Sequence, residues 1–474
     1  MTLKKHPSGF HVRAAIVGIL CCLLLSAWCP LALTATAVDI PATTAVTEAA
    51  PTEDRVGSVY LCNLENNLIL YEKNSTAKVY PASSVKIMTG LLACRALVDR
   101  QDEAVTVTAA MLSGASGRTM GLQIGEVLTI RDLLYATLCG GYNDAACVLA
   151  CLSSGSVVSF VEEMNREAAR IGAAATNYTN PTGLHDEAMA TTAADTALVA
   201  REAWQNELFM ACTSAVNYTI PATNTSDERY FSNRNSLLSD RSGTYYNGYC
   251  QGMNAGMIDE SVSGIGGWCV VTVWEKNGAS NLAIVMEGAD VDIGEDVPAY
   301  RYVNRLLAWA DRNYGYRRVL TEGEVFSTHP VTMTGIGESE ADLVVPQDVL
   351  LYLPKSVDLA SALTFNYTLN GDELTAPLTE GERVGMLTVT YQGQAVGSVP
   401  LIVTESFERN GFLDFLASSR SYLTSRAFMA TVVCFVILVL IYLKWTTGPG
   451  RRYGVRDVRR RTVRYRRQKR RYRY

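Results

Sequence analysis

Alternating hydrophobic and polar positions open the region that follows residue 55. The run "GSVYLCNLENNLILYEKN", residues 57–74, predicts two short strands on either side of a polar turn. Farther along, residues 267–289 read "GWCVVTVWEKNGASNLAIVMEGA" and contain two apolar runs joined by Asn277 and Gly278. Because an Asn-Gly pair accepts the positive φ values of a tight turn, this segment predicts a β-hairpin.

Hydrophobic residues after Pro81 follow a helical period instead. They form two stripes along the predicted helix, so that most of its faces are apolar. This predicts a buried helix rather than a surface one. A second helix is predicted to begin near Thr129, where "TIRD" places Asp132 three residues after the hydroxyl in a capping-box arrangement. The mixture of strands and helices predicts an α/β (α+β) domain over residues 56–316. The two stripes are Val85, Met88, Leu92 and Ala96, and Ile87, Leu91, Cys94 and Val98.

The pattern changes between about residues 319 and 403, where short alternating runs show no helical period. Residues 363–369 and 387–391 alternate apolar and polar side chains, and each run ends at a turn pair, Asn370-Gly371 or Gln392-Gly393. Such runs predict a separate small all-β domain over residues 319–405.

Two long apolar runs lie near the ends of the chain. The first begins at Ala14 after a basic start and reaches the small residues at 35–37, the order typical of a secretory signal peptide over residues 1–37. An uncleaved N-terminal anchor is the alternative. Either one places the following residues outside the membrane.

The second apolar run, Ala427 to Leu443, has 17 residues and only Thr431 and Tyr442 as polar interruptions. This length is at the short end of the range that spans a bilayer. It predicts a transmembrane helix over residues 427–445, and the preceding segment, 406–426, is predicted to be an amphipathic juxtamembrane helix.

The charge distribution sets the orientation of that helix. From Lys444 to the end there are fourteen Lys or Arg residues and one acid, Asp457, so this tail carries +13. Because the whole chain is −5, the residues before the tail carry −18. Basic residues accumulate on the cytoplasmic side, where anionic lipid attracts them. We therefore expect a cytoplasmic tail over 446–474 and no nucleic-acid binding, since nothing else in the chain resembles a nucleic-acid module.

Residues 38–55 are rich in Ala, Thr, Pro and acids and have no periodic apolar pattern, which predicts a flexible tether. Eight cysteines lie outside the two membrane segments, and disulfides remain open from the sequence. Four of the eight lie inside apolar runs, where a buried free thiol is expected. No metal site is predicted at Cys147 and Cys151, which have no His or second Cys pair around them. The four cysteines in apolar runs are Cys94, Cys147, Cys151 and Cys269.

The stretch "YPASSVK", Tyr80 to Lys86, places a hydroxyl and an amine three residues apart at the start of the buried helix. Residues at this spacing share a helix face. A desolvated lysine has a lowered pKa and can accept the proton of a serine hydroxyl. This predicts Ser83 as nucleophile and Lys86 as general base. A capping serine with a lysine that reaches solvent is the alternative, and Ser84 is a second possible nucleophile.

The context of this pair resembles a known family. Residues 71–93, "YEKNSTAKVYPASSVKIMTGLLA", closely resemble the first active-site motif of the D-alanyl-D-alanine carboxypeptidases, the low-molecular-weight penicillin-binding serine peptidases. Further resemblances follow in the family's order and extend over about residues 56–405. They are "GLQIGEVLTIRDLLYATLCGGYNDAACVLA" with the Ser-x-Asn motif, "TNYTNPTGLHDE" with the Asn-Pro-x-Gly-Leu loop, "GYCQGMNAGMIDE" with the Lys-Thr-Gly strand, and "GERVGMLTVTYQGQAVGSVPLIV" in the β domain.

The resemblance implies a serine β-lactamase/penicillin-binding-like catalytic domain and an acyl-enzyme mechanism without a cofactor or metal. Ser83 would attack the carbonyl between the two terminal D-alanines of a peptidoglycan stem peptide, and Lys86 would act as general base. Asn143 would position the substrate and intermediate. The backbone N–H groups of Ser83 and Met257 would form the oxyanion hole. β-Lactams are implied as covalent ligands.

Two of the implied motifs depart from the family's pattern. The second, Ser-x-Asn, reads Gly141-Tyr142-Asn143 and lacks the hydroxyl. The third, Lys-Thr-Gly, reads Asn254-Ala255-Gly256 and lacks both the cation and the hydroxyl implied to contact the substrate. Hydrogen bonds to charged groups contribute about 1.5–3 kcal/mol each. The altered motifs therefore give candidate substrate-binding residues whose hydrogen bonds to the substrate differ from the family's pattern. They are Gly141, Asn254, Ala255 and Gly256.

Nearby cations are candidates for replacing the lost charge: Arg234, Arg241 and Lys276. Two functions follow from the sequence. In the first, the protein is an active carboxypeptidase that removes the terminal D-alanine through an acyl-enzyme on Ser83. In the second, it is a catalytically weak homologue that binds cell-wall peptides or organises other wall enzymes. Retention of Ser83, Lys86 and Asn143 favours the enzyme.

Overall fold

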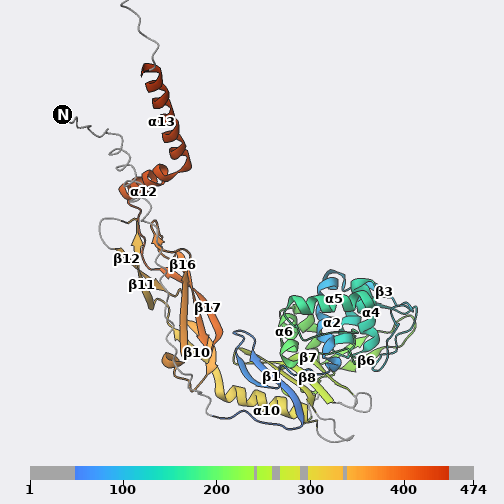
Figure 1. Cartoon of the computed structure of the whole chain (residues 1–474). Coiled ribbons are helices and arrows are strands. Elements are labelled where there is room, and N and C mark those ends of the chain that lie inside the picture. Colours follow the sequence, from blue (N-terminus) through green and yellow to red (C-terminus); the bar gives the residue numbers. More distant parts are fainter. Residues whose placement is uncertain (1–47, 240–242, 259–266, 289–296, 335–338, 448–474) are drawn as a thin grey trace, which may run out of the picture. The chain divides into compact units, whose positions relative to one another are not determined.

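The computed structural model describes residues 48–239, 243–258, 267–288, 297–334 and 339–447 (Figure 1). The predicted signal peptide, Arg241 and nearly all of the basic tail lie outside the described residues.

A five-stranded antiparallel sheet forms the centre of the catalytic domain, in the order β2-β1-β9-β8-β7. Both predicted pairs of strands are present, and the turn between β8 and β9 contains Asn277 and Gly278 at φ of 56° and 80°. The hairpin prediction is therefore confirmed. The strands are β1 (Val56–Asn63), β2 (Ile69–Lys73), β7 (Cys250–Ile258), β8 (Gly267–Lys276) and β9 (Ala279–Gly288).

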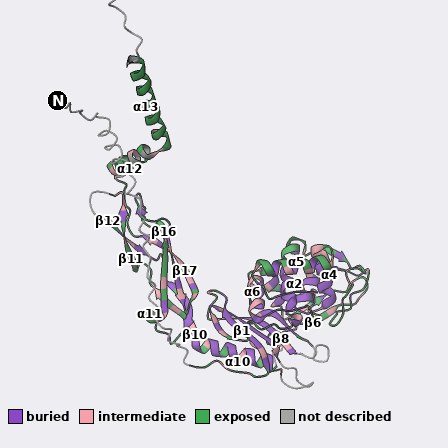
Figure 2. Cartoon of the chain, in the orientation of Figure 1, coloured by how far each residue is buried: buried purple, intermediate pink, exposed green. Residues whose placement is uncertain are grey.

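Alternate residues of this sheet belong to two hydrophobic cores. In β8, Val271 and Val273 pack in the core that contains α2, whereas Val270 and Trp274 pack in the core that contains α10. This period of two is what a strand buried on both faces requires. Figure 2 shows the buried colour running through α2 and the sheet. The helices are α2 (Val85–Leu97), α3 (Ile130–Leu138), α4 (Asn143–Ser154), α5 (Val157–Arg170), α6 (Ala193–Trp204), α7 (Glu207–Thr213), α8 (Ser236–Ser239) and α10 (Pro298–Asn313).

Helix α2 is buried along most of its length, as its apolar stripes predicted, but Ala96 and Val98 at the ends of the two stripes are exposed. Helix α3 begins as predicted with a capping box, in which the Thr129 side chain accepts from Asp132 N–H and the Asp132 carboxylate accepts from Thr129 N–H. The smaller elements of this domain are η1 (Ala82–Ser84), η2 (Val98–Arg100), β3 (Ala104–Thr106), β4 (Val127–Thr129), β5 (Asn217–Ile220) and β6 (Arg229–Ser232).

The all-β domain is present after α10. Its main sheet has six strands in the order β14-β16-β17-β12-β11-β15, and β10 pairs with β13. The first strand begins at Tyr314, five residues before the predicted start at 319, and a short helix, α11 (Leu359–Ala362), interrupts the strands. The strands are β10 (Tyr314–Leu320), β11 (Val325–Thr332), β12 (Ser339–Val344), β13 (Val349–Pro354), β14 (Leu363–Leu369), β15 (Leu374–Thr375), β16 (Arg383–Tyr391) and β17 (Gln394–Val403).

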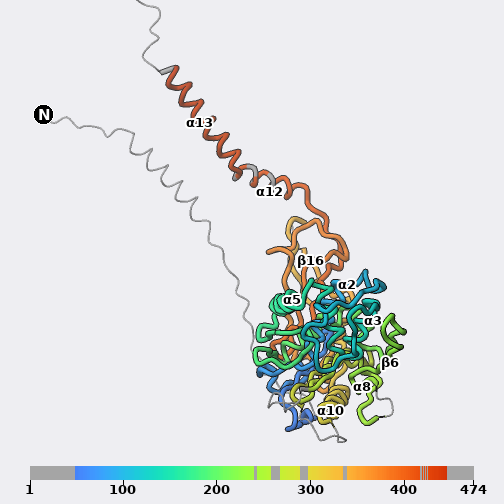
Figure 3. Tube along the Cα trace, turned by 90° about the vertical axis from the view of Figure 1, so that its right-hand side faces the viewer, coloured from blue at the N-terminus to red at the C-terminus, as the bar shows by residue number. Residues whose placement is uncertain are grey.

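Two helices end the described chain, α12 (Gly411–Thr424) and α13 (Arg426–Thr447), and one leads directly into the other (Figure 3). Residues Arg426–Trp445 have a mean hydropathy of 2.5 and no buried residue, so this helix is long and apolar enough to cross a membrane. It coincides with the span expected from the sequence.

The end of the segment predicted as a flexible tether differs from that expectation. The carbonyl of Glu48 accepts from Trp309 Nε1 at 2.8 Å, and the carbonyl of Pro51 accepts from the Tyr302 hydroxyl at 2.8 Å. Residues 48–55 are thus held against α10. The hydrophobic pattern could not indicate this, because the contacts use backbone carbonyls and the ion pairs of Glu48 with Arg312 and of Glu53 with Arg305.

All eight cysteines between residues 56 and 426 are free thiols. Cys94, Cys147 and Cys269 are buried as expected, and Cys151 is half-buried. Burial raises the pKa of Cys269 to about 12, so this thiol stays protonated at neutral pH. Within the described ranges, no group of three or more His, Cys, Asp or Glu side chains could hold a metal ion.

Gly90 tests the packing of α2. A methyl group on this residue would overlap Leu138 and lie 3.0 Å from the Phe209 ring. We expect Gly90→Ala to destabilise the catalytic domain by about 1–3 kcal/mol, because overpacking outweighs the higher helix propensity of alanine. The measurement is the thermal unfolding temperature of the full chain in detergent. Gly371→Ala, where a methyl group meets only one atom at 3.8 Å, is the control, and an equal shift in both variants would contradict the prediction.

Candidate active site

A cleft of about 310 Å³ lies where the start of α2, the start of α4, strand β7 and two loops converge. Four of the residues predicted for the site line this cleft, Ser83, Asn143, Gly256 and Met257, together with residues that were not predicted from the sequence. The lining residues are Ser83, Gly117, Arg118, Asn143, Thr182, Gly183, Leu184, His185, Arg234, Gly256 and Met257.

The structure brings Ser83 and Lys86 together. Ser83 lies in the η1 turn and Lys86 in the first turn of α2, with Lys86 Nζ 3.4 Å from Ser83 Oγ. Lys86 is 1% exposed, and its Nζ donates to the carbonyl oxygen of Thr182 at 2.6 Å. A neutral amine that donates to this carbonyl keeps a lone pair available for the serine proton.

Burial is the main reason that the pKa of Lys86 falls from 10.5 to about 7, since desolvation disfavours the ammonium form. The positive charges of Arg118 and Arg234 lower it further. A substantial fraction of Lys86 is therefore neutral at neutral pH, as a general base requires.

The two neighbouring serines have different surroundings. The Ser84 hydroxyl is buried and donates to the carbonyl of Pro81 at 2.6 Å. Ser83 lines the cleft beside Lys86. The geometry thus gives Ser84 a local structural hydrogen bond and leaves Ser83 facing the ligand space.

Two glycines allow the backbone to approach Ser83 closely. A Cβ on Gly256 would lie 2.6 Å from Ser83 Oγ, and a Cβ on Gly183 would overlap the carbonyl of Ala82. Gly183 also has φ of +81°, which favours glycine. Ala82, the residue before Ser83, itself has φ of 49°, an unusual value for a residue with a side chain. Ser83 is thus held between strand β7 and the loop at 182–185.

Asn143, the last residue of the second motif, and Asp144 hold the loop at 116–122. The Asn143 side chain donates to the carbonyl of Ser116 at 2.7 Å, and its backbone N–H donates to the carbonyl of Arg118 at 2.7 Å. The Asp144 carboxylate accepts the backbone N–H groups of residues 120–122 at 3.0 to 3.1 Å. This loop forms one wall of the cleft through Gly117 and Arg118.

The residues of the third motif are divided between the cleft and the core. Gly256 and Met257 line the cleft. Ala255 is 1% exposed and packs in the core that contains α10. Asn254 is 3% exposed, and its Oδ1 is buried without a hydrogen-bond partner in the described part of the chain.

Of the two cations suggested by sequence proximity that the structure describes, only Arg234 lines the cleft. Lys276 instead pairs with Asp311 at 2.6 Å, and Arg241 lies outside the described residues. Arg118 was missed because it lies 25 residues before Asn143 in a loop without a motif. No sequence pattern indicated that it would line the same cleft as Ser83.

The comparison with family models matches residues 44–290 to the D-alanyl-D-alanine carboxypeptidase peptidase family. The chain belongs to this family of serine D-alanyl-D-alanine carboxypeptidases. Residues 314–409 match the C-terminal domain of penicillin-binding protein 5, so the two-domain arrangement is also that of the family. The family acts on peptidoglycan, and membership implies peptide substrates and β-lactam binding.

Individual relatives agree with this membership. The chain is 26% identical over 373 residues to the D-alanyl-D-alanine carboxypeptidase DacF of Bacillus subtilis, covering 76% of this chain and 87% of the relative. It is 28% identical to DacD of Escherichia coli, covering 75% and 88%. Among solved structures, penicillin-binding protein 5 of Haemophilus influenzae has 25% identity, a TM-score of 0.57 and coverage of 76% and 100%. PBP3 of Streptococcus pneumoniae has 22% identity, a TM-score of 0.62 and coverage of 75% and 99%, which is a likeness of fold.

Gly256 provides a test of the site in this carboxypeptidase-family chain. We expect Gly256→Ala to reduce labelling by a fluorescent penicillin by roughly a hundredfold or more, because the added methyl group displaces Ser83 by a distance that near-attack geometry does not tolerate. The measurement is the second-order labelling rate of the full chain in detergent. Gly248→Ala, whose methyl group would meet only the side chain of Tyr246, is the control. Normal labelling of Gly256→Ala would show that the acylated residue lies elsewhere.

Proposed function

We propose that this chain is an active serine-type D-alanyl-D-alanine carboxypeptidase that removes the terminal D-alanine from peptidoglycan stem peptides. The observation that carries the proposal is the pair formed by Ser83 and the buried Lys86 at the cleft, with Nζ and Oγ 3.4 Å apart. The buried lysine excludes the reading in which it reaches solvent as a surface side chain.

In the acylation step, Ser83 Oγ attacks the carbonyl carbon between the two D-alanines while neutral Lys86 takes the hydroxyl proton. The negative charge that forms on the carbonyl oxygen would be stabilised by the backbone N–H groups of Ser83 and Met257, two residues that line the cleft. The C–N bond then breaks. The proton held by Lys86 goes to the leaving nitrogen, and D-alanine departs.

In the deacylation step, water attacks the ester on Ser83. Lys86 takes a proton from this water and returns it to Ser83 Oγ as the ester bond breaks. The shortened peptide leaves with a new carboxylate. Atoms and protons balance over the two steps without a cofactor.

Asn143 orients the reacting amide in this scheme, and its own side-chain contact with Ser116 keeps it in place. Tyr142 does not take over the hydroxyl missing at Gly141 from within the cleft. Its ring packs against Arg118 and Phe231, and it is not among the described residues that line the cleft. Proton delivery to the leaving amine therefore falls to Lys86.

The altered motifs favour a second candidate function. Ala255 has no hydroxyl, and Asn254 has no charge, so ligand contacts implied by the family's pattern are missing. A chain that binds stem peptides but turns them over slowly would act as a cell-wall peptide-binding or scaffolding protein.

We also propose a location for the chain in the cell envelope and boundaries for its segments. A signal peptide over 1–37 would place the catalytic domain, 56–316, and the β domain, 319–405, outside the cell membrane. The helix at 427–445 would anchor them, and the tail at 446–474 would be cytoplasmic beside anionic lipid. β-Lactams would acylate Ser83, and nucleic acid is not a partner.

Ser83 separates the two functions. We expect the full chain in detergent to release D-alanine from an acyl-D-alanyl-D-alanine peptide, and Ser83→Ala to reduce release by roughly a thousandfold or more, because the nucleophile is removed. Ser84→Ala is the matched control and should retain most of the activity. Equal rates in the wild-type chain and in Ser83→Ala would contradict the enzyme, and labelling by penicillin without D-alanine release would support the weak homologue.

The pH dependence of acylation tests Lys86. The neutral amine is the active form, so the acylation rate should rise with pH through about 7 and then level off. An ordinary lysine, with a pKa of 10.5, would give a rate that still rises at about pH 9. The measurement is the rate of penicillin labelling from about pH 5 to about pH 9. A rate independent of pH over this range would contradict the assignment of Lys86 as base.

A further inference from the structure

The two arginines of the cleft, Arg118 and Arg234, both lie close to Gly141. A Cβ on Gly141 would lie 3.6 Å from the Cβ and Cγ of Arg234 and 4.0 Å from Nε of Arg118. Two cationic side chains therefore start from or reach the position where the second motif has lost its side chain.

Arg118 is fixed through both its backbone and its side chain. Its carbonyl accepts from Asn143 N–H at 2.7 Å, and its Nε donates to the carbonyl of Gly140 at 2.9 Å. Its guanidinium carbon lies 4.9 Å from the centre of the Tyr142 ring. A stacked guanidinium whose Nε is already bonded leaves its terminal N–H groups for a ligand.

Arg234 is held against the same short segment. Its backbone N–H donates to the carbonyl of Cys139 at 2.9 Å, and its guanidinium carbon lies 5.1 Å from the centre of the Trp268 ring. Segment 139–143 thus sets the positions of both arginines.

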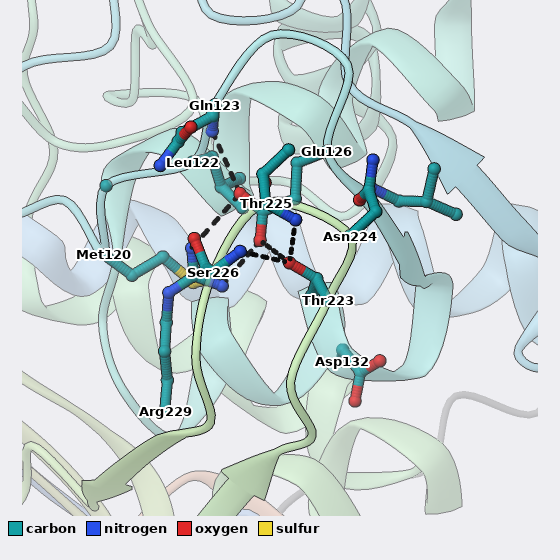
Figure 4. Close-up of polar contacts among 12 residues, drawn as sticks. Met120, Leu122, Gln123, Glu126, Asp132, Thr223, Asn224, Thr225, Ser226 and Arg229 are labelled. Carbon is teal, nitrogen blue, oxygen red and sulfur yellow. Dashed lines mark hydrogen bonds and ion pairs between the residues drawn. The ribbon is translucent and has the colours of Figure 1, made fainter.

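A buried clasp joins the chain segments that carry them (Figure 4). Arg229, in the hairpin that precedes Arg234, donates to the Glu126 carboxylate at 2.7 and 3.1 Å, and Glu126 is 0% exposed. The Thr223 hydroxyl donates to the same carboxylate at 3.0 Å. This clasp ties the β5–β6 hairpin to the end of the loop that contains Arg118.

Neither arginine has a carboxylate partner among the residues that the structure describes. Two guanidinium groups at one cleft repel each other, and burial together with the charge of Arg118 lowers the pKa of Arg234. A bound anion relieves this repulsion.

We propose that Arg118, stacked on Tyr142, supplies the positive charge that Asn254 no longer provides and binds the terminal carboxylate of the peptide together with Arg234. The inference rests on the proposed function in one respect, the identity of the ligand as a peptide with a free C-terminal carboxylate. Guanidinium groups suit this ligand because they bind carboxylates through two parallel hydrogen bonds. Arg118 is then a specificity residue of this chain, outside the three motifs.

The experiment measures binding without turnover. The full chain carrying Ser83→Ala, in detergent, is titrated calorimetrically with an acyl-D-alanyl-D-alanine peptide and with the same peptide as its C-terminal amide. We expect the carboxylate form to bind more tightly. Adding Arg118→Ala should raise the dissociation constant of the carboxylate peptide by roughly tenfold to a hundredfold. The dissociation constant of the amide peptide should change by less than about twofold.

Arg166→Ala in the same background is the control. Arg166 is a surface arginine of α5 paired with Glu163, so its removal changes the net charge equally without touching the cleft. Equal weakening of both peptides by Arg118→Ala, no weakening of either, or no preference for the carboxylate in the parent would overturn the inference. D-Alanine release by the chain with Ser83 intact is measured separately. If the chain prefers the carboxylate peptide through Arg118 but releases no D-alanine, this inference holds and the carboxypeptidase proposal fails.

Discussion

An amine buried in a protein core costs free energy unless a partner accepts its hydrogens and the charge is lost or balanced. Lys86 meets this condition through the Thr182 carbonyl at 2.6 Å and a pKa near 7. Helix α2 must be buried to desolvate this amine, and the loop at 182–185 must come close enough to bond it. The backbone also approaches this turn closely at two glycines. A side chain on Gly183 would overlap the Ala82 carbonyl, and a side chain on Gly256 would overlap Ser83. The packing of the domain and the reactivity of the site therefore have one cause.

The segment 139–144 connects this centre to the walls of the cleft. Its carbonyls and side chains bond Arg234, Arg118 and the loop at 116–122. The segment runs into α4, which is buried against α2, so a rigid helix carries the arrangement. Rigid support of this kind matters because a charged group displaced by about 1 Å from its correct position relative to the ligand loses much of its effect. The clasp between Glu126 and Arg229 supports the same loop from its other end.

Under the proposed function, the pair Ser83 and Lys86 performs the bond chemistry, and the positive charge that binds the ligand has moved to another part of the cleft. Ser83 and Lys86 would perform bond making and proton transfer, and the ligand's carboxylate would be recognised by arginines on the loop and after the hairpin. Both arginines also lower the pKa of Lys86. Recognition and base strength are thereby coupled, since an anion bound between the arginines reduces their effect on the amine.

The sequence by itself determined the elements with strong local signals. These were the buried helix α2, the capping box at Thr129, the Asn277-Gly278 hairpin, the β domain and the apolar helix near the C-terminus, because each depends on periodicity or turn chemistry within a few residues. It also selected Ser83 and Lys86, which are neighbours along one helix. Only the tertiary structure decided that Arg118 and Arg234 flank Gly141, that Lys276 pairs with Asp311 instead, and that residues 48–55 pack on α10. These contacts join segments far apart in the chain through backbone carbonyls and long side chains, which leave no periodic pattern in the sequence.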